Sequence, residues 1–191
     1  MRVVAVNGSA RKDGNTARLV EAMFVALRKA GHECEQIQLA TKRVEGCTAC
    51  GACYKKKDRR CHGRKDFGNG VIEALDGADA IVLASPVYFA DVTAEMKAII
   101  DRAGYVARAN GNMFARKPAA SIAAVRRAGA IHTLDTMNHL FLIGEMILVG
   151  SSYWNLGLGG AAGEVENDVE GLSTMTRLGE NMAWLLDRLE T

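Results

Sequence analysis

Short apolar runs alternate with amphipathic, helix-like patterns along most of the chain. Most of these runs are rich in Val, Ile and Ala, which is typical of strands buried in a sheet. They predict five strands, at residues 3–6, 34–39, 80–84, 119–125 and 146–149. Between them, apolar residues recur with the three- and four-residue spacing of a helix. This spacing predicts helices over residues 15–30, 70–75, 93–103, 131–143 and 168–189.

Alternating strands and helices predict an α/β fold, a doubly wound parallel sheet with helices on both faces. For five strands joined by right-handed crossovers, the leading order is the flavodoxin-like 2-1-3-4-5. Ligands of such sheets bind at the carboxyl ends of the strands, near the point where the strand order reverses. We find no internal repeat and no domain boundary, so residues 1–191 are expected to form a single flavodoxin-like domain.

Two segments interrupt the alternating pattern. Residues 40–69 are irregular and rich in Cys, Lys, Arg and Gly. A connection of this length inside a compact domain is usually functional or disordered. Residues 150–163 are rich in Gly and are expected to form a loop.

The composition is that of an ordinary globular domain, with 49% hydrophobic and 24% charged residues among 191. A net charge of +2 gives no reason to expect a nucleic-acid partner. No apolar run is long enough to cross a membrane, and the first nine residues lack a signal-peptide pattern, so we expect a cytoplasmic protein with no membrane partner. Because disulfides are rare in the cytoplasm, the clustering of four of the five cysteines within fifteen residues favours metal binding or redox chemistry.

The first candidate loop, Gly-Ser-Ala-Arg-Lys-Asp-Gly-Asn-Thr at residues 8–16, connects the first strand to the first helix. A helix N-terminus offers unpaired N–H groups and a partial positive charge, which suit a phosphate group. The loop lacks the motifs of triphosphate and dinucleotide sites, so a phosphate monoester is favoured. The alternative is an ordinary capped turn, with Ser9 and Asn15 as local hydrogen-bond partners. The candidate phosphate ligands are Ser9, Arg11, Lys12, Gly14, Asn15 and Thr16.

The second candidate loop, Ser-Pro-Val-Tyr-Phe-Ala at residues 85–90, follows the third predicted strand. Pro86 and the two aromatic residues can form a flat apolar wall with exposed backbone N–H groups, as a flavin ring requires. The alternative is that Tyr88 and Phe89 only pack in or over the core. Together with the phosphate loop, in the expected strand order, the flavin interpretation is the better one.

Three segments resemble the NAD(P)H-dependent FMN reductase-like group of flavodoxin-fold proteins, and the resemblance spans nearly the whole chain. They are Gly-Ser-x-Arg-x-x-Gly-Asn-Thr at residues 8–16, Ser-Pro-Val-Tyr-Phe at 85–89 and Thr-Ala-Glu-Met-Lys-Ala-Ile-Ile-Asp-Arg at 93–102. The resemblance implies FMN as cofactor, with its phosphate held by Ser9, Arg11, Asn15 and Thr16. It also implies that the flavin ring is lined by Pro86, Val87, Tyr88 and Phe89. A third flavin loop is implied at residues 125–129, with Arg126, Arg127 and Ala128, although the family often has more glycine there.

The cysteine motif Cys47-x-x-Cys50-x-x-Cys53, followed by Cys61, is the most specific chemical signal in the sequence. Three thiolates at three-residue spacing can wrap one corner of a [4Fe–4S] cubane and leave the fourth iron for a more distant cysteine. Structural zinc sites usually use two separated pairs of ligands, so zinc is a weaker alternative, as are metal-free redox thiols. An FMN reductase-like domain with this motif resembles the iron–sulfur flavoprotein family. That resemblance implies all four cysteines as ligands; His62 is a weaker candidate for the fourth.

The cysteine segment is also basic. A solvated basic loop is the plain interpretation. The sharper hypothesis is a docking surface for an acidic electron carrier such as a ferredoxin, and positive charge there should also raise the potential of a cluster. The basic residues are Lys55, Lys56, Lys57, Arg59, Arg60, Arg64 and Lys65.

The fifth cysteine and an aromatic pair lie outside these motifs. Cys34, in the second predicted strand, is expected to be a buried packing residue. Tyr153 and Trp154 follow the fifth strand and either cover a flavin or form a subunit contact.

The favoured function is an oxidoreductase with FMN and a [4Fe–4S] cluster, moving electrons from a donor such as ferredoxin to an acceptor through FMN. No catalytic acid or base is expected, because the cofactor carries the chemistry. The alternatives are an NAD(P)H-dependent FMN or quinone reductase without a cluster, and a redox sensor. The resemblance implies a homodimer or homotetramer with clusters close to flavins near subunit contacts.

Overall fold

The computed structural model describes residues 1–190 and has a parallel sheet at its centre. The neighbouring strands pair in the order β2-β1-β3-β4-β5, which confirms the predicted order. Every strand pairing is parallel. The strands are β1 (Arg2–Asn7), β2 (Glu33–Gln38), β3 (Ala80–Pro86), β4 (Pro118–Val125), β5 (Ile147–Leu148) and β6 (Leu156–Leu158).

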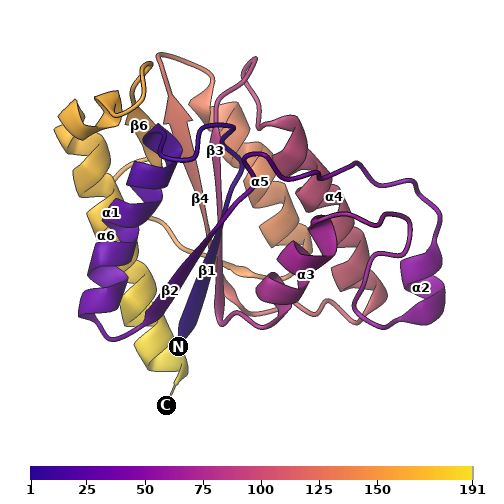
Figure 1. The fold of residues 1–191 in the computed structure, drawn as a ribbon. Helices are drawn as coiled ribbons and strands as arrows, with labels where there is room; N and C mark the ends of the chain where they lie inside the picture. Colours follow the sequence, from indigo (N-terminus) through magenta and orange to yellow (C-terminus); the bar gives the residue numbers. More distant parts are fainter. Residues whose placement is uncertain (191) are drawn as a thin grey trace.

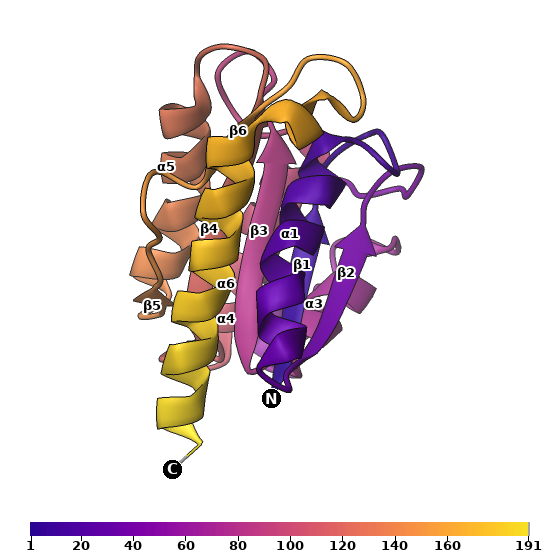
Figure 2. The same ribbon diagram turned by 90° about the vertical axis from the view of Figure 1, so that its left-hand side faces the viewer.

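Helices cover both faces of this sheet (Figures 1 and 2). α1 (Asn15–Lys29) and α6 (Val169–Leu189) pack side by side on one face. The other face carries α3 (Gly68–Asp76), α4 (Ala94–Ala109) and α5 (Ala130–Ile143). The predicted flavodoxin-like, doubly wound architecture is therefore confirmed. Among the helices of residues 1–190, none combines the length and the apolarity needed to cross a membrane.

Alternate residues of the central strands enter two separate cores. In β1, Val3 and Ala5 face the core under α1 and α6. Val4 and Val6 face the core under α3, α4 and α5. A strand between two helical layers has no solvent face, which explains the continuous apolar runs seen in the sequence.

The fifth position of the sheet is divided between two short strands. β5 pairs with β4 at Pro118 and Ala119, while β6 pairs with the other end of β4, from Ala123 to Val125. The prediction of a loop over residues 150–163 is wrong in this respect. Gly157, within β6, explains the misleading composition, because a Cβ there would lie 2.5 Å from Leu19 Cδ2.

Two differences concern the cysteine segment. A short helix, α2 (Ala52–Lys56), forms inside the segment for which the residue pattern predicted no regular structure. α4 runs six residues beyond the predicted end at residue 103, to Ala109. Its last turns contact α2, so the prolonged helix is the platform on which the cysteine segment rests.

The close crossing of α6 over α1 gives a stability prediction. A Cβ at Gly179 would overlap the backbone oxygen of Met23 and lie 2.9 Å from Ala26 Cβ. We expect Gly179→Ala to lower the free energy of unfolding by about 1–3 kcal/mol, because backbone atoms cannot yield to an added methyl group.

Gly70→Ala is the matched control, since Gly70 is exposed in α3 and has nothing within 4 Å of its Cβ position. Helix propensity alone should leave the stability of this variant unchanged or raise it by up to about 1 kcal/mol. Urea unfolding compares both variants with the wild type. A Gly179→Ala protein as stable as the wild type would contradict the close-packed crossing.

Candidate functional site

The loops that follow β1, β3 and β4 meet around one pocket at the carboxyl edge of the sheet. Figure 1 shows these loops together at the upper end of the strands. The lining residues that the sequence predicted are Ser9, Arg11, Asn15, Thr16, Pro86, Val87, Tyr88 and Arg126. Ala124, Gly159 and Gly160 also line the pocket. Lys12, Gly14, Phe89, Arg127 and Ala128, which were also predicted, are not among the lining residues.

The phosphate-type loop is shaped by its own polar groups. The Asn7 side chain accepts a hydrogen bond from the Ser9 N–H at 2.9 Å, and Ser9 Oγ accepts one from the Arg11 N–H at 3.1 Å. Gly14 precedes α1 and provides no side-chain cap, and the first turn of α1 holds no acidic residue. The N-terminus of α1 thus keeps uncapped amides and a partial positive charge toward the pocket, as an anion site requires.

Asn15 lines the pocket, and its side chain also binds a neighbouring loop. Its Nδ2 donates to the Ala161 carbonyl at 2.8 Å, and its Oδ1 accepts from the Gly163 N–H at 2.8 Å. Its side chain therefore fastens the segment after β6 against the first loop. A Cβ at Gly159 would lie 2.7 Å from Asn15 Nδ2, so glycine is needed for this close approach.

Sequence reasoning missed this fourth wall of the pocket, formed by Gly159 and Gly160. The available signal was the glycine-rich composition directly after the fifth predicted strand, combined with the rule that ligands bind at strand ends. Arg11 Nη1 donates to the Gly160 carbonyl at 3.2 Å, so two loops far apart in sequence are joined at the pocket.

The turn after β3 is held by its backbone. The Tyr88 N–H donates to the Asp91 carbonyl at 2.9 Å, and Phe89 and Ala90 both have positive φ. The Phe89 side chain is fully exposed and Tyr88 is half-exposed, so neither ring belongs to the core. A Cβ at Gly129, whose φ is 90°, would lie 2.9 Å from Ala90 Cα, so this turn and the loop after β4 are in contact.

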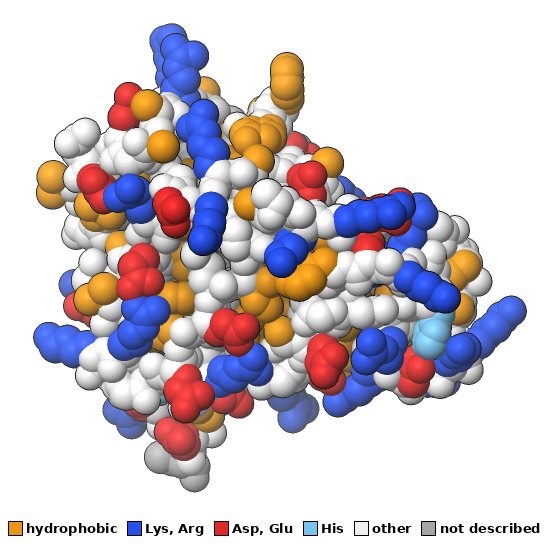
Figure 3. Space-filling view, viewed as in Figure 1, with side chains coloured by type: hydrophobic (Ala, Val, Ile, Leu, Met, Phe, Trp, Pro, Cys, Tyr) orange, Lys and Arg blue, Asp and Glu red, His pale blue; other side chains and the backbone are white. Residues whose placement is uncertain are grey.

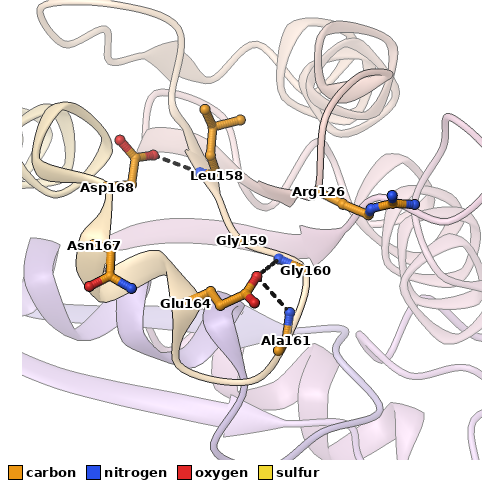
Figure 4. A pocket seen from close by; sticks show the side chains of 8 residues that line it. All are labelled: Arg126, Leu158, Gly159, Gly160, Ala161, Glu164, Asn167 and Asp168. Carbon is orange, nitrogen blue, oxygen red and sulfur yellow. Dashed lines mark hydrogen bonds between the residues drawn. The ribbon is translucent and has the colours of Figure 1, made fainter.

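An open groove of about 860 Å³ adjoins the pocket and shares Arg126, Gly159 and Gly160 with it (Figure 4). Glu164 Oε2 accepts hydrogen bonds from the N–H groups of Gly160 at 2.7 Å and Ala161 at 2.9 Å (Figure 4). The hydrogen bonds from Ala161 and Gly160 lower the pKa of Glu164. An ionised Glu164 thus holds the glycine loop that separates groove from pocket.

The structure brings the four predicted cysteine ligands together around a second cavity, of about 130 Å³. Cys47 and Cys50 precede α2, Cys53 lies in it, and Cys61 follows it. The other lining residues are Thr48, Ala49, Gly51, Tyr54, Arg102, Tyr105 and Val106. Within residues 1–190, no three His, Cys, Asp or Glu side chains are placed to bind one single metal ion.

Local contacts shape the cysteine segment and tie it to the domain. Cys61 is held through its backbone, because Asn69 accepts from the Cys61 N–H at 2.8 Å and donates to the Cys61 carbonyl at 2.9 Å. Cys53 and Cys61 pack against the core under α3, α4 and α5. A Cβ at Gly63 would lie 2.5 Å from Thr48 Oγ1 and 3.1 Å from Cys50 Sγ, so a larger residue there would displace Thr48 and Cys50.

His62 and Cys34 lie apart from this cavity. His62 is not among the lining residues and is instead hydrogen-bonded to the Asp58 carboxylate at 2.9 Å. Cys34 packs against the core under α1 and α6, but it is only partly buried, which corrects the expectation of a buried residue. The reason is that β2 is the edge strand of the sheet.

The pocket and the cysteine cavity lie toward different ends of α4. Thr93, which caps α4, donates through Oγ1 to the Gly8 carbonyl at 2.9 Å and so touches the first loop. Tyr105 and Val106, at the cavity, are about twelve residues further on, or roughly 18 Å along the helix axis. Figure 1 shows α2 far from the loops at the upper edge of the sheet.

Comparison with known proteins identifies the family. Residues 1–161 match the family described as NADPH-dependent FMN reductase. An iron–sulfur flavoprotein of Methanocaldococcus jannaschii is 34% identical over 193 aligned residues, which cover 96% of this chain and 96% of the relative. The chain belongs to the iron–sulfur flavoprotein family. The resemblance seen in the sequence is therefore confirmed, and the chain is an FMN-dependent oxidoreductase.

A more distant relative agrees with this family, and a solved structure agrees with the fold. An iron–sulfur flavoprotein of Methanosarcina thermophila is 27% identical over 192 residues, covering 100% of this chain and 97% of the relative. The solved structure of the Trp repressor binding protein from Bacillus subtilis shares the fold, with a TM-score of 0.66 and 21% identity. The match covers 92% of this chain and 96% of that structure.

The thiols of this iron–sulfur flavoprotein family member differ in acidity, which gives a second prediction. Hydrogen bonds from the Ala52 N–H and the Thr48 hydroxyl lower the pKa of Cys50. Burial raises the pKa of Cys53 and that of Cys34. Because the thiolate is the reactive form, a lowered pKa moves reactivity to lower pH.

In reduced, metal-free protein we expect iodoacetamide to modify Cys50 at lower pH than Cys53 or Cys34. Peptide mass spectrometry over a pH series around the ordinary thiol pKa of about 8.5 measures the three profiles. Superimposed profiles would contradict the assigned hydrogen bonds.

Proposed function

We propose that the chain is an electron-transfer flavoprotein that holds FMN in the strand-end pocket and a [4Fe–4S] cluster between Cys47, Cys50, Cys53 and Cys61. The observation that carries the proposal is the arrangement of four thiols, spread over fifteen residues, around one cavity. Thiolates are the ligands that iron–sulfur clusters take. A bound cluster supplies one-electron chemistry, and a bound FMN accepts single electrons or a hydride.

The surroundings of the thiols fit such a cluster. Tyr54, Tyr105 and Val106 give the cavity an apolar wall, and apolar surroundings of this kind tune the potential of a cluster. Thr48, Ala49 and Gly51 are small neighbours in the loop between the first cysteines. The Ala49 N–H donates to Cys47 Sγ at 3.4 Å, so one backbone amide already points at a ligand sulfur.

The strand-end pocket fits the phosphate of FMN. The uncapped amides of α1, together with Arg11, supply donors and positive charge at one side of the pocket. Thr16 lines the same pocket and is almost completely buried. Pro86 to Tyr88 provide an apolar wall on the β3 side, where the isoalloxazine ring would lie. The role of the protein is to bind and orient this cofactor.

The electron donor that we propose is an acidic iron–sulfur protein of the ferredoxin type. Arg59 and Arg60 are paired with Asp76 at 3.1 Å and Glu73 at 3.6 Å. Lys55 and Lys57 are exposed and have no acidic partner within residues 1–190. Lys55 is close enough to Cys50 to help lower the pKa of its thiol. The space-filling view shows blue side chains gathered around the cysteine segment at the right-hand side (Figure 3).

We also propose a homodimer or homotetramer. Exposed apolar side chains gather at the end of α5, on β5 and in the following segment. They are Leu142, Ile143, Ile147, Leu148, Tyr153 and Trp154. Tyr153 and Trp154 line a separate cavity beside α5 and not the strand-end pocket, which favours a subunit contact over a flavin cover. The separation of the two sites along α4 fits an assembly in which another copy shortens the path between cluster and flavin.

A second candidate is an NAD(P)H-dependent FMN or quinone reductase without a cluster. The open groove beside the pocket favours it, because a second planar ligand could reach the flavin from that side. It predicts rapid NAD(P)H oxidation with no iron in the protein.

Removal of a single cysteine tests the cluster ligands. We expect reconstituted Cys53→Ala to lose most of its iron and sulfide, because one of four ligand thiolates is missing. It should keep FMN, because the pocket lies at the other end of α4. Cys34→Ala is the matched control and should keep both cofactors. A Cys53→Ala protein with wild-type iron content would overturn the ligand assignment.

Charge removal tests the docking surface. We expect the double variant Lys55→Gln, Lys57→Gln to be reduced by ferredoxin about three- to tenfold more slowly at low salt, with the difference vanishing at high salt. The control removes the same charge from the opposite face with Lys29→Gln and Arg177→Gln. Equal stopped-flow rates of reduction by ferredoxin in the lysine double variant and the control double variant would contradict the docking hypothesis.

A further inference from the structure

Arg102, in α4, is a charged residue inside the hydrophobic core. It is 1% exposed, and its side chain forms an ion pair with the side chain of Asp66, which is also buried. Arg102 Nη1 lies 2.8 Å from both Asp66 carboxylate oxygens and 3.1 Å from the Glu45 carbonyl oxygen. A Cβ at Gly68 would lie 2.5 Å from the same nitrogen, so glycine makes the room that the guanidinium occupies. Buried charges of this kind require partners.

Only one nitrogen of the guanidinium uses these partners. Arg102 Nε and Nη2 are buried and have no hydrogen-bond partner within the described chain. Unsatisfied buried donors are rare in proteins and call for an explanation. Asp66 and Glu45 accept hydrogen bonds from Nη1 alone. They do not account for the burial of Nε and Nη2.

The unpartnered nitrogens belong to a side chain that borders the cysteine cavity. Arg102 lines that cavity, whereas Asp66 does not, so the ion pair presents its positive partner to the four thiols. Cys61 lines the same cavity and is close enough to the Arg102 guanidinium to interact with it. The cavity therefore has a fixed, desolvated cation at its wall.

We propose that Arg102 is a positioning residue for the cluster, donating through Nε or Nη2 to the Cys61 thiolate or an adjacent cluster sulfur and thereby raising the reduction potential. The inference rests on the proposed function, because it needs the cluster at this cavity. A four-thiolate cluster is an anion that becomes more negative when it gains one electron. A nearby cation and hydrogen bonds to sulfur stabilise the reduced form more than the oxidised form.

A buried cation acts differently from the lysines on the surface of the same segment. Charges in solvent are screened by salt, while a buried charge is screened much less. The contribution of Arg102 to the potential should therefore persist at high ionic strength. The contribution of Lys55 and Lys57 should not.

Redox titration of reconstituted protein tests the role of Arg102. Each step adds one electron from dithionite to the oxidised cluster, with no bond to Arg102 made or broken. We expect Arg102→Gln to lower the ratio of reduced to oxidised cluster about tenfold at a fixed potential. For a one-electron couple this equals a fall of about 59 mV in the midpoint potential. Arg102→Lys keeps the charge but loses the forked pair of donors, so its midpoint potential should fall less than that of Arg102→Gln.

Arg108→Gln is the matched control. It removes the same charge from an exposed position on the same helix, and Arg108 does not line the cavity. We expect its midpoint potential to equal that of the wild type. Equal potentials for Arg102→Gln, Arg108→Gln and the wild type, with full iron content, would overturn the inference while leaving the proposed function intact.

A spectroscopic measurement on the wild type avoids the risk that the variants fold poorly. In protein labelled with ¹⁵N-arginine, pulsed electron paramagnetic resonance of the reduced cluster should detect a coupled arginine nitrogen. Absence of that coupling would overturn the inference even if the Arg102 variants lose their cluster. Wild-type protein that binds no iron after reconstitution would instead overturn the proposed function, and the inference with it.

Discussion

Parallel pairing of the strands is the constraint on which both candidate sites depend. Because all paired strands run in one direction, the loops after β1, β3 and β4 must emerge at one edge of the sheet. The central strands are buried on both faces, so their registers are fixed by two cores at once. This rigid frame allows loops with positive φ and uncapped amides to keep their shape at the pocket.

The cysteine segment is an addition that uses the outer helices of the frame. It is fixed at its start by Glu45, through Arg102 and Asp66, and at its end by Asn69. Fixing a segment by a buried ion pair has a high cost in desolvation free energy, because both charges leave water. Our proposal accounts for this cost, because Arg102 then interacts with two anions, the Asp66 carboxylate and the cluster that we propose for the cavity.

Much of this arrangement can be predicted from local patterns in the sequence. The alternation of apolar runs and helical stripes was enough for the strand order, and the spacing of Cys47, Cys50 and Cys53 pointed to their common cavity. β6 escaped prediction because its three residues include Gly157, which is there for packing against Leu19. The hydrogen bond from the Asn15 side chain to the Ala161 carbonyl joins loops almost 150 residues apart, and no local pattern contains such a contact. The burial of Arg102 did have a signal, since it lies on the same helical stripe as Ile99 and Val106.

The central claim is that one chain holds both an FMN and a four-cysteine cluster. The most direct measurement is the content of iron, sulfide, zinc and flavin in wild-type protein purified and reconstituted without oxygen. We expect about four irons, about four sulfides and about one FMN per chain, as a [4Fe–4S] flavoprotein requires. FMN with zinc, or FMN with no metal after reconstitution, would contradict the two-cofactor design and favour a simple NAD(P)H-linked reductase.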